Sequence, residues 1–247
     1  MDQHQETTEL RHSSAESHVS HPYPLGPTLS VEGTNFSVFS ANATAMEIVL
    51  FDHADDLQPA RVIALDPILD RTSHYWHIFV PGIKAGQLYG YRADGPCDPP
   101  AGHRFDRHKV LIDPYGKSVS VSQHYSRAAA SKPGDNSAAS MKSVVIDLSA
   151  FDWERDVPLN RPFRSTVIYE MHVAGFTRHP NSGVAPAKRG TYLGVIDKIP
   201  YLQALGITAV ELMPVFQFDA QDAIPGLSNY WGYSPSSFFA PHLAYSS

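Results

Sequence analysis

Apolar residues repeat with two different periods in this chain, and the change from one to the other near residue 165 of 247 limits the possible folds more than any other feature. Before that point, short runs alternate apolar and polar residues between turn residues, a pattern typical of strands that bury one face. After it, the order is strand, helix, strand, and the strands are apolar on both faces. The sequence therefore predicts an antiparallel part followed by a part with parallel strands.

The alternating runs from residue 24 to residue 150 predict an antiparallel β-sandwich of the immunoglobulin-like, carbohydrate-binding-module type. TNFSVFS puts Phe36 and Val38 on one face, and HYWHIFV alternates in the same way. Because large rings in a sandwich usually fill its core, we expect Trp76, Tyr75 and Tyr89 to be core residues rather than a glycan-binding surface. His74 and His77 lie three apart on a strand and so on opposite faces, which argues against a zinc site.

The region from residue 165 to residue 247 predicts the first βα units of an incomplete (β/α)₈ barrel. TVIYEMHV and ITAVELMPV are the expected parallel strands, and IDKIPYLQALG is a helix that begins just before Pro200 and ends at Gly206. A complete barrel of this kind takes roughly 250 residues. We therefore expect the barrel to stop before its third strand, with residues 151–164 as a linker and residues 1–23 as a disordered tail.

Composition excludes several classes of function. The formal charge is −6 and the 19 Lys and Arg residues are scattered, which is unlike a nucleic-acid-binding protein. No apolar run has the length of a membrane span or a signal sequence, and the single cysteine, Cys97, forms no internal disulfide. No ligand cluster predicts a metal or a cofactor. We expect a soluble, cytoplasmic protein that acts on a small or neutral partner.

Several ordered motifs carry a family resemblance. IYEMHVAGFT, GTYLGVIDKIPYLQALGITAVELMPV and NYWGYSPSSFFAP resemble, in that order, the start of the catalytic barrel in the α-amylase superfamily. Upstream, YGYRADGP and GHRFDRHKVLIDPYGK are similar to the amino-terminal sandwich of its isoamylase and glycogen-debranching branch. Because the motifs keep their order and spacing, together they are far more specific than any one of them.

The resemblance implies a retaining glycoside hydrolase that cleaves α-1,6 branch linkages of glycogen, amylopectin-like glucan or limit dextrin. That chemistry needs two carboxyl groups about 5 Å apart. In the family they follow later strands, so we assign no catalytic residue in this chain and expect it to be an inactive amino-terminal fragment. Two alternatives remain: a non-catalytic glucan-binding or regulatory fragment, and a related α-glucan branching enzyme. Oligomeric state, calcium dependence and branch-length preference are not predicted.

The aromatic stretch SNYWGYSPSSFFAP contains the candidate substrate-binding residues. The resemblance implies that Tyr233 stacks on a glucose ring, and Trp231 and Asn229 are the other candidates. The polar loop residues Asn229 and His242 have an alternative interpretation as turn or capping residues. We expect Phe238 and Phe239 to pack against other parts of the protein, because phenylalanine has no polar group to orient a sugar.

Two further residues have competing interpretations. Glu170 and Glu211 lie on the two predicted parallel strands, and on neighbouring strands they would form a catalytic pair. The interpretation that we favour is structural, with both carboxylates hydrogen-bonded to backbone or to His172 and Arg178. His172 itself is expected to be a core histidine with its hydrogen bonds satisfied.

Overall fold

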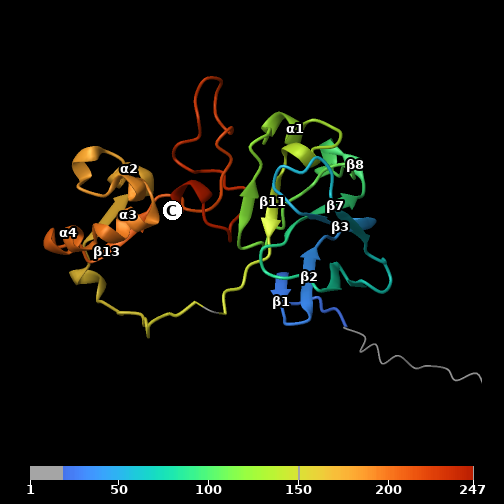
Figure 1. Cartoon of the computed structure of the whole chain (residues 1–247), viewed down its shortest axis with the longest axis horizontal. Helices are drawn as coiled ribbons and strands as arrows, with labels where there is room; N and C mark the ends of the chain where they lie inside the picture. Colours follow the sequence, from blue (N-terminus) through green and yellow to red (C-terminus); the bar gives the residue numbers. More distant parts are fainter. Residues whose placement is uncertain (1–18, 150, 247) are drawn as a thin grey trace, which may run out of the picture.

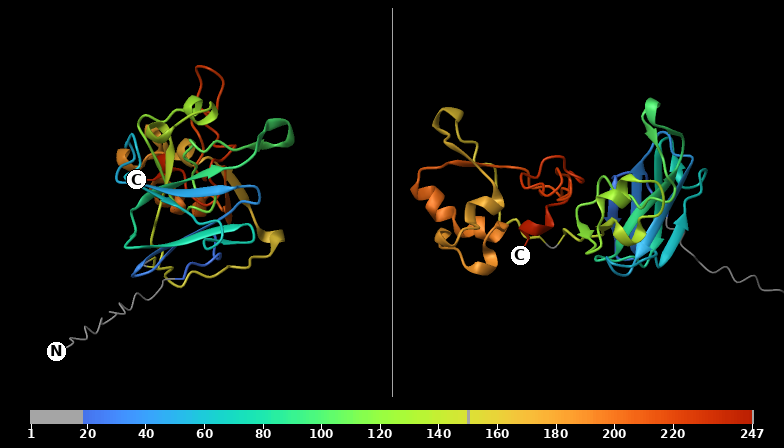
Figure 2. Two further views of the ribbon diagram at one scale, coloured as in Figure 1. Left: turned by 90° about the vertical axis from the view of Figure 1, so that its right-hand side faces the viewer. Right: turned by 90° about the horizontal axis from the view of Figure 1, so that it is seen from above.

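A computed structural model describes residues 19–149 and 151–246, which form two bodies with a long loop between them (Figure 1). One body is built of antiparallel strands, and the other contains two parallel strands with short helices. The loop of residues 214–246 lies between the bodies in Figure 1 and in the right-hand view of Figure 2. The candidate site therefore has to be sought where this loop meets each body.

The first body contains two antiparallel sheets. The four-stranded sheet has the order β1-β2-β6-β5, and its strands are β1 Gly26–Leu29, β2 Gly33–Phe39, β6 Tyr75–Pro81 and β5 Arg71–Thr72. The five-stranded sheet has the order β10-β11-β7-β3-β4, and its strands are β10 Val119–Val121, β11 Met141–Val144, β7 Leu88–Asp94, β3 Ala45–Phe51 and β4 Arg61–Ala64. A hairpin of β8 (Cys97–Asp98) with β9 (His103–Arg104) and the helix α1 (Arg127–Ser131) complete this body. The predicted β-sandwich is confirmed.

The core of the sandwich follows the predicted alternation. Phe36 and Val38 of β2 pack in one cluster with Trp76 and Tyr89, and the last two side chains are fully buried. Tyr75, by contrast, is 37% exposed, so its predicted place in the core is wrong. The β3 strand is buried on both faces, because its Val49 and Phe51 side chains pack with Val110 in a second cluster.

The outer face of β2 is polar but buried, because residues 20–22 run across it. Asn35 exchanges two hydrogen bonds of 2.9 Å with the backbone of His21, and the Ser37 hydroxyl donates to Pro22 O. Ser20 Oγ lies 2.8 Å from Nδ1 of His77. A disordered tail was predicted up to residue 23, and these contacts correct that for residues 20–22. Residues 1–18 lie outside the described residues.

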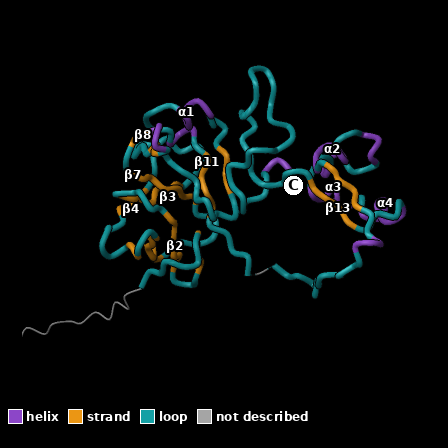
Figure 3. Tube along the Cα trace, turned by 180° about the vertical axis from the view of Figure 1, so that it is seen from behind, coloured by secondary structure: helices purple, strands orange, loops and turns teal. Residues whose placement is uncertain are grey.

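The segment predicted as a linker has no helix or strand from residue 151 to residue 162, and every side chain in it is exposed (Figure 3). A 3₁₀ turn, Phe163–Ser165, ends it. Phe151 and Trp153 make an edge-to-face contact with each other at 4.8 Å, and both remain more than 60% exposed.

The second body is a βαβ unit. Its strands β12 (Ile168–Met171) and β13 (Ala209–Leu212) pair in parallel, as predicted. Between them lie the helices α2 (Val173–Thr177), α3 (Tyr192–Asp197) and α4 (Ile199–Ala204). Together they make a unit that ends near the start of the long loop.

The predicted helix start just before Pro200 is confirmed, because α4 begins at Ile199, and a separate helix, α3, ends before it at Asp197. Pro200 lies in the first turn of α4, where its missing N–H costs nothing, and it could not have continued α3. Gly206 follows with φ +85° and donates to Gln203 O, so it ends α4 as the sequence predicts. Leu202 is buried, but the other apolar side chains expected on the same helix face are 45–54% exposed: Ile196, Ile199 and Leu205.

Candidate functional site

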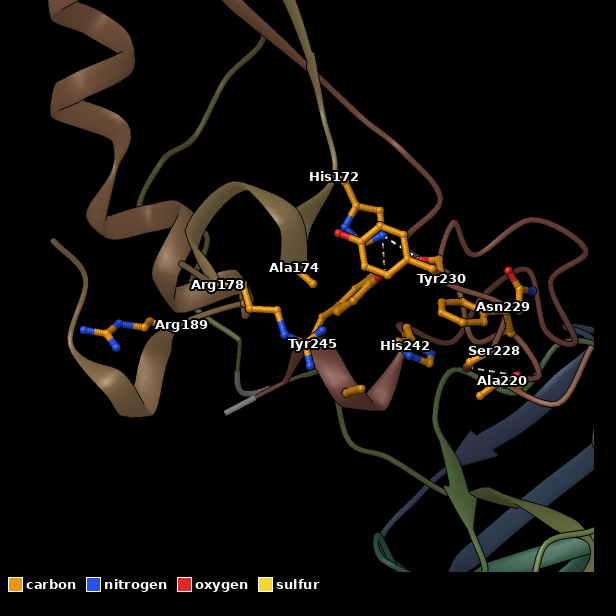
Figure 4. A pocket seen from close by; sticks show the side chains of 13 residues that line it. His172, Ala174, Arg178, Arg189, Ala220, Ser228, Asn229, Tyr230, His242 and Tyr245 are labelled. Carbon is orange, nitrogen blue, oxygen red and sulfur yellow. Dashed lines mark hydrogen bonds between the residues drawn. The ribbon is translucent and has the colours of Figure 1, made fainter. Parts of the chain in front are cut away.

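A pocket of about 450 Å³ lies where the long loop meets the βαβ unit (Figure 4). It begins directly after β12, at His172, and the loop forms its opposite side. Its lining combines imidazole, phenol and guanidinium groups with small residues: His172, Ala174, Arg178, Arg189, Gly190, Phe218, Ala220, Ser228, Asn229, Tyr230, His242, Ala244 and Tyr245. Among the described residues, no Asp or Glu side chain lines it.

His172 organises the βαβ side of the pocket. Its Nδ1 accepts from Gly175 N at 3.0 Å and so caps α2. Its Nε2 lies 2.8 Å from the Tyr230 carbonyl, which can only accept, so the proton of the neutral ring is on Nε2. The Tyr245 hydroxyl is 3.1 Å from the same nitrogen. The predicted core histidine with satisfied hydrogen bonds is confirmed.

Tyr230 connects this histidine to the loop. Its ring stacks on His172 with the centroids 4.3 Å apart and the planes at 11°. Trp231 then meets Tyr230 edge-to-face at 5.2 Å. A continuous contact therefore runs from the end of β12 to the first candidate sugar-binding ring.

His242 is the second buried imidazole of the pocket. It stacks on Phe218 at 3.8 Å and 15°, and its Nδ1 has no hydrogen-bond partner among the described residues. Burial, and to a smaller extent the neighbouring His172, lower the pKa of His242 to about 4. The ring is therefore neutral at pH 7 and works as an aromatic packing surface.

The candidate sugar-binding rings lie outside this pocket. Trp231 is 55% exposed and Tyr233 is 58% exposed. Asn229 does line the pocket, but its Oδ1 accepts from Gly232 N and its Nδ2 donates to Tyr233 O. Its side chain thus holds the turn that carries the two rings, as the alternative interpretation of this residue expects.

The backbone of the loop is closely constrained. Phe216 pairs with Pro241, and Phe218 pairs with Pro235, in isolated antiparallel bridges. Gly232 has φ +79°, and a Cβ built on it would lie 3.0 Å from the Phe218 ring. Glycine is needed here both for the left-handed backbone and for the close approach of the ring.

The two phenylalanines of the aromatic stretch differ. Phe239 stacks on Tyr115 of the sandwich at 5.5 Å and 20°, as its predicted packing role requires. Phe238 is 62% exposed, so the same prediction is wrong for it.

Glu170 and Glu211 are direct neighbours in the register of β12 and β13. Both are exposed, and no hydrogen bond or ion pair joins either carboxylate to another described residue. The predicted bonds to His172 and Arg178 are therefore not made. Neither carboxylate lines the pocket.

Sequence reasoning missed Tyr230, Tyr245 and Arg178 as pocket residues. Tyr245 belongs to the 3₁₀ turn Leu243–Tyr245, and it reaches His172 across 73 residues of chain. The only available signal was the position of His172 at the end of a predicted strand, where loops of parallel strands gather functional groups. Figure 4 shows the Arg178 side chain directed toward Tyr245.

The described residues contain no group of three or more His, Cys, Asp or Glu side chains that could hold a metal ion. None of the helices in that part of the chain has the length and apolar character needed to cross a membrane.

Comparison with known proteins supports the resemblance. Residues 24–116 match the family model of carbohydrate-binding module 48, the isoamylase N-terminal domain. Isoamylase 1 (chloroplastic) of Oryza sativa is 42% identical over 92% of this chain and 28% of its own length. The GlgX homologue of the glycogen operon in Mycobacterium tuberculosis is 43% identical over 91% of this chain and 32% of its own length.

The solved structures agree at the level of the fold. Pullulanase from Paenibacillus barengoltzii, in a crystal with maltohexaose and α-cyclodextrin, superposes with a TM-score of 0.69 at 24% identity. The match covers 94% of this chain and 34% of that one. The expected family resemblance is confirmed: this chain is related to isoamylases and GlgX proteins, and it spans about a third of the length of those relatives.

Proposed function

We propose that this chain is part of a glycoside hydrolase that cleaves α-1,6 branch linkages of glycogen or a related α-glucan in the cytoplasm. The similarity to isoamylase and GlgX proteins over nine-tenths of the chain supports this. The parallel pair β12–β13 agrees with the start of a (β/α)₈ barrel. The exposed apolar side chains on α3 and α4 are the surface that further βα units of such a barrel would cover.

The chain by itself is proposed to bind glucan without cleaving it. Retaining hydrolysis needs two carboxyl groups about 5 Å apart on either side of the bond. Glu170 and Glu211 are neighbours on β12 and β13, and neither lines the pocket or contacts the aromatic loop, so we assign them no catalytic role. We therefore assign the chain the aromatic part of the substrate site.

One observation carries this proposal: Trp231 and Tyr233 remain more than half exposed on a loop whose backbone is fixed on both sides. An aromatic face packs well against the C–H face of a sugar ring, and the phenol and indole groups add polar contacts at the rim. Holding these rings in place before binding reduces the entropy that binding would otherwise cost.

The test is native electrophoresis of residues 1–247 in gels with and without glycogen. We expect glycogen to retard the wild type and Tyr233→Ala to weaken the affinity about tenfold, the effect of losing roughly 1.4 kcal/mol of ring contact. Phe238→Ala is the matched control, since Phe238 is equally exposed in the same loop and has no assigned role. A wild type that glycogen does not retard, or equal losses in the two variants, would contradict the proposal.

A further inference from the structure

The long loop is also attached to the sandwich, through residues next to the pocket-lining Phe218 and Ala220. There the sandwich contributes Tyr125 and Arg127, which lie on either side of the residue that caps α1. The loop contributes Asp219, Gln221 and Asp222. The two segments are more than 90 residues apart in sequence.

Asp219 is the centre of this contact. Its side chain is 3% exposed, and its Oδ2 accepts from the Tyr125 hydroxyl at 2.8 Å and from Arg127 Nη1 at 2.9 Å. Its Oδ1 accepts from Gln221 N at 2.8 Å. A buried carboxylate is stable only when its oxygens are paired in this way, so the geometry has little freedom.

Two residues close to Asp219 in the loop, Gln221 and Asp222, also bind the same sandwich residues. Gln221 accepts from Arg127 N and donates to Tyr125 O, both at 2.9 Å. Asp222 pairs with Arg127 Nη2 at 2.8 Å. Two sandwich residues thus hold three polar residues within a four-residue stretch of the loop, through both side chain and backbone.

The attachment continues directly into the aromatic stretch. Ala220, next to Asp219, accepts through its carbonyl from Asn229 N at 3.0 Å and from Ser228 Oγ at 3.1 Å. Phe218, on the other side of Asp219, pairs with Pro235 and lies directly under Gly232. Both ends of the turn that presents Trp231 and Tyr233 are therefore built on the residues beside Asp219.

We propose that Asp219 is a positioning residue for glucan binding: with Tyr125 and Arg127 of the sandwich, it holds the aromatic loop in the conformation that presents Tyr233. The sandwich then contributes to binding by fixing this loop, without itself contacting the sugar. This inference rests on the proposed function, because it takes glucan as the ligand of the loop.

The experiment compares Tyr125→Phe and Asp219→Asn in residues 1–247. Tyr125→Phe keeps the ring and removes one hydrogen bond, so folding is preserved even if Asp219→Asn is less stable. The matched control is Asp135→Asn, because Asp135 pairs with Arg92 at 3.5 Å and its contacts all lie within the sandwich. Hydrogen exchange of residues 216–241 without glucan measures loop attachment, and glycogen affinity measures its effect on binding.

We expect Tyr125→Phe and Asp219→Asn, and not Asp135→Asn, to exchange amide hydrogens faster in residues 216–241 and to bind glycogen about fivefold more weakly than the wild type. A double-mutant cycle separates positioning from general stability. If Tyr125 affects binding only by positioning the Tyr233 ring, Tyr125→Phe should change the glycogen affinity less than about twofold in a Tyr233→Ala background.

The outcomes are distinguishable. Unchanged hydrogen exchange in both Tyr125→Phe and Asp219→Asn would show that these residues do not hold the loop. Faster exchange with unchanged glycogen affinity would show that holding the loop has no role in binding. Additive losses in the cycle also overturn positioning. A wild type that does not bind glycogen overturns the proposed function, whereas the exchange experiment still decides whether Asp219 holds the loop.

Discussion

Single residues show how much this fold depends on paired polar groups inside the sandwich. Asp113 is fully buried, and it accepts hydrogen bonds of 2.8 Å from the Tyr89 hydroxyl and from Tyr115 N. These bonds favour the charged form, but burial has the larger effect and raises the pKa of Asp113 to about 6. The sandwich therefore prefers this carboxyl group protonated.

This preference predicts a pH dependence of stability. Between the unfolded pKa of 3.8 and about 6, the folded protein keeps the Asp113 proton and the unfolded chain loses it. The contribution of Asp113 is therefore fully present below pH 4 and is lost as the pH rises to about 6, by up to about 3 kcal/mol. Urea unfolding from pH 4 to pH 7.5 should show this loss in the wild type relative to Asp113→Asn. Parallel pH curves for the two proteins would exclude it.

At the scale of elements, the βαβ unit contains an unfavourable pair. Glu170 and Glu211 project side by side from one face of the parallel sheet, and no cation lies in contact with either of them among the described residues. Like charges opposite each other on adjacent strands destabilise a sheet. Nothing in the sequence pattern gives this register, because each strand has apolar residues on both faces and would tolerate a shift.

We expect Glu211→Gln to raise the free energy of unfolding by about 0.5 kcal/mol at low salt. Glu170→Gln should give the same gain, and the double variant little more, because either substitution already removes the repulsion. Urea unfolding followed by circular dichroism measures the effect. The gain should shrink in 1 M NaCl, where screening is strong, and a gain independent of salt would point to another cause.

The helices and strands themselves could largely be predicted from the sequence, but the contacts between distant segments could not. Alternation predicted β2 and β6, and Gly206 predicted the end of α4, because these signals are local. Pro200 predicted the start of α4 in the same way, but the separate helix α3 that precedes it was not predicted. The pocket brings together His172, Tyr230 and Tyr245 from distant segments, and no local pattern contains that information.

At the scale of the whole molecule, one segment connects the two bodies covalently and a different segment makes the non-covalent contacts between them. The chain passes from the sandwich to the βαβ unit through an exposed segment, but the contacts between the bodies are made by the later loop, through Asp219 and through the stack of Phe239 on Tyr115. Such contacts were not predictable, because each depends on side chains more than 90 residues apart.

Limited trypsin digestion should therefore cut first in the exposed segment, at Arg155 or Arg164, and leave the two pieces associated. Gel filtration should show one peak at the position of the intact chain, while denaturing electrophoresis shows two bands. Two peaks in gel filtration would mean that the loop contacts do not hold the bodies together. Digestion of Asp135→Asn, which leaves those contacts unchanged, is the control.

The hydrogen bonds of residues 20–22 have a practical consequence for anyone who isolates the sandwich. A clone that begins at residue 24, where the family match begins, would delete the partners of Asn35, Ser37 and His77. Those groups would open to water, and the sheet would gain an unprotected polar surface that the intact chain never shows. Expression should start upstream of Ser20.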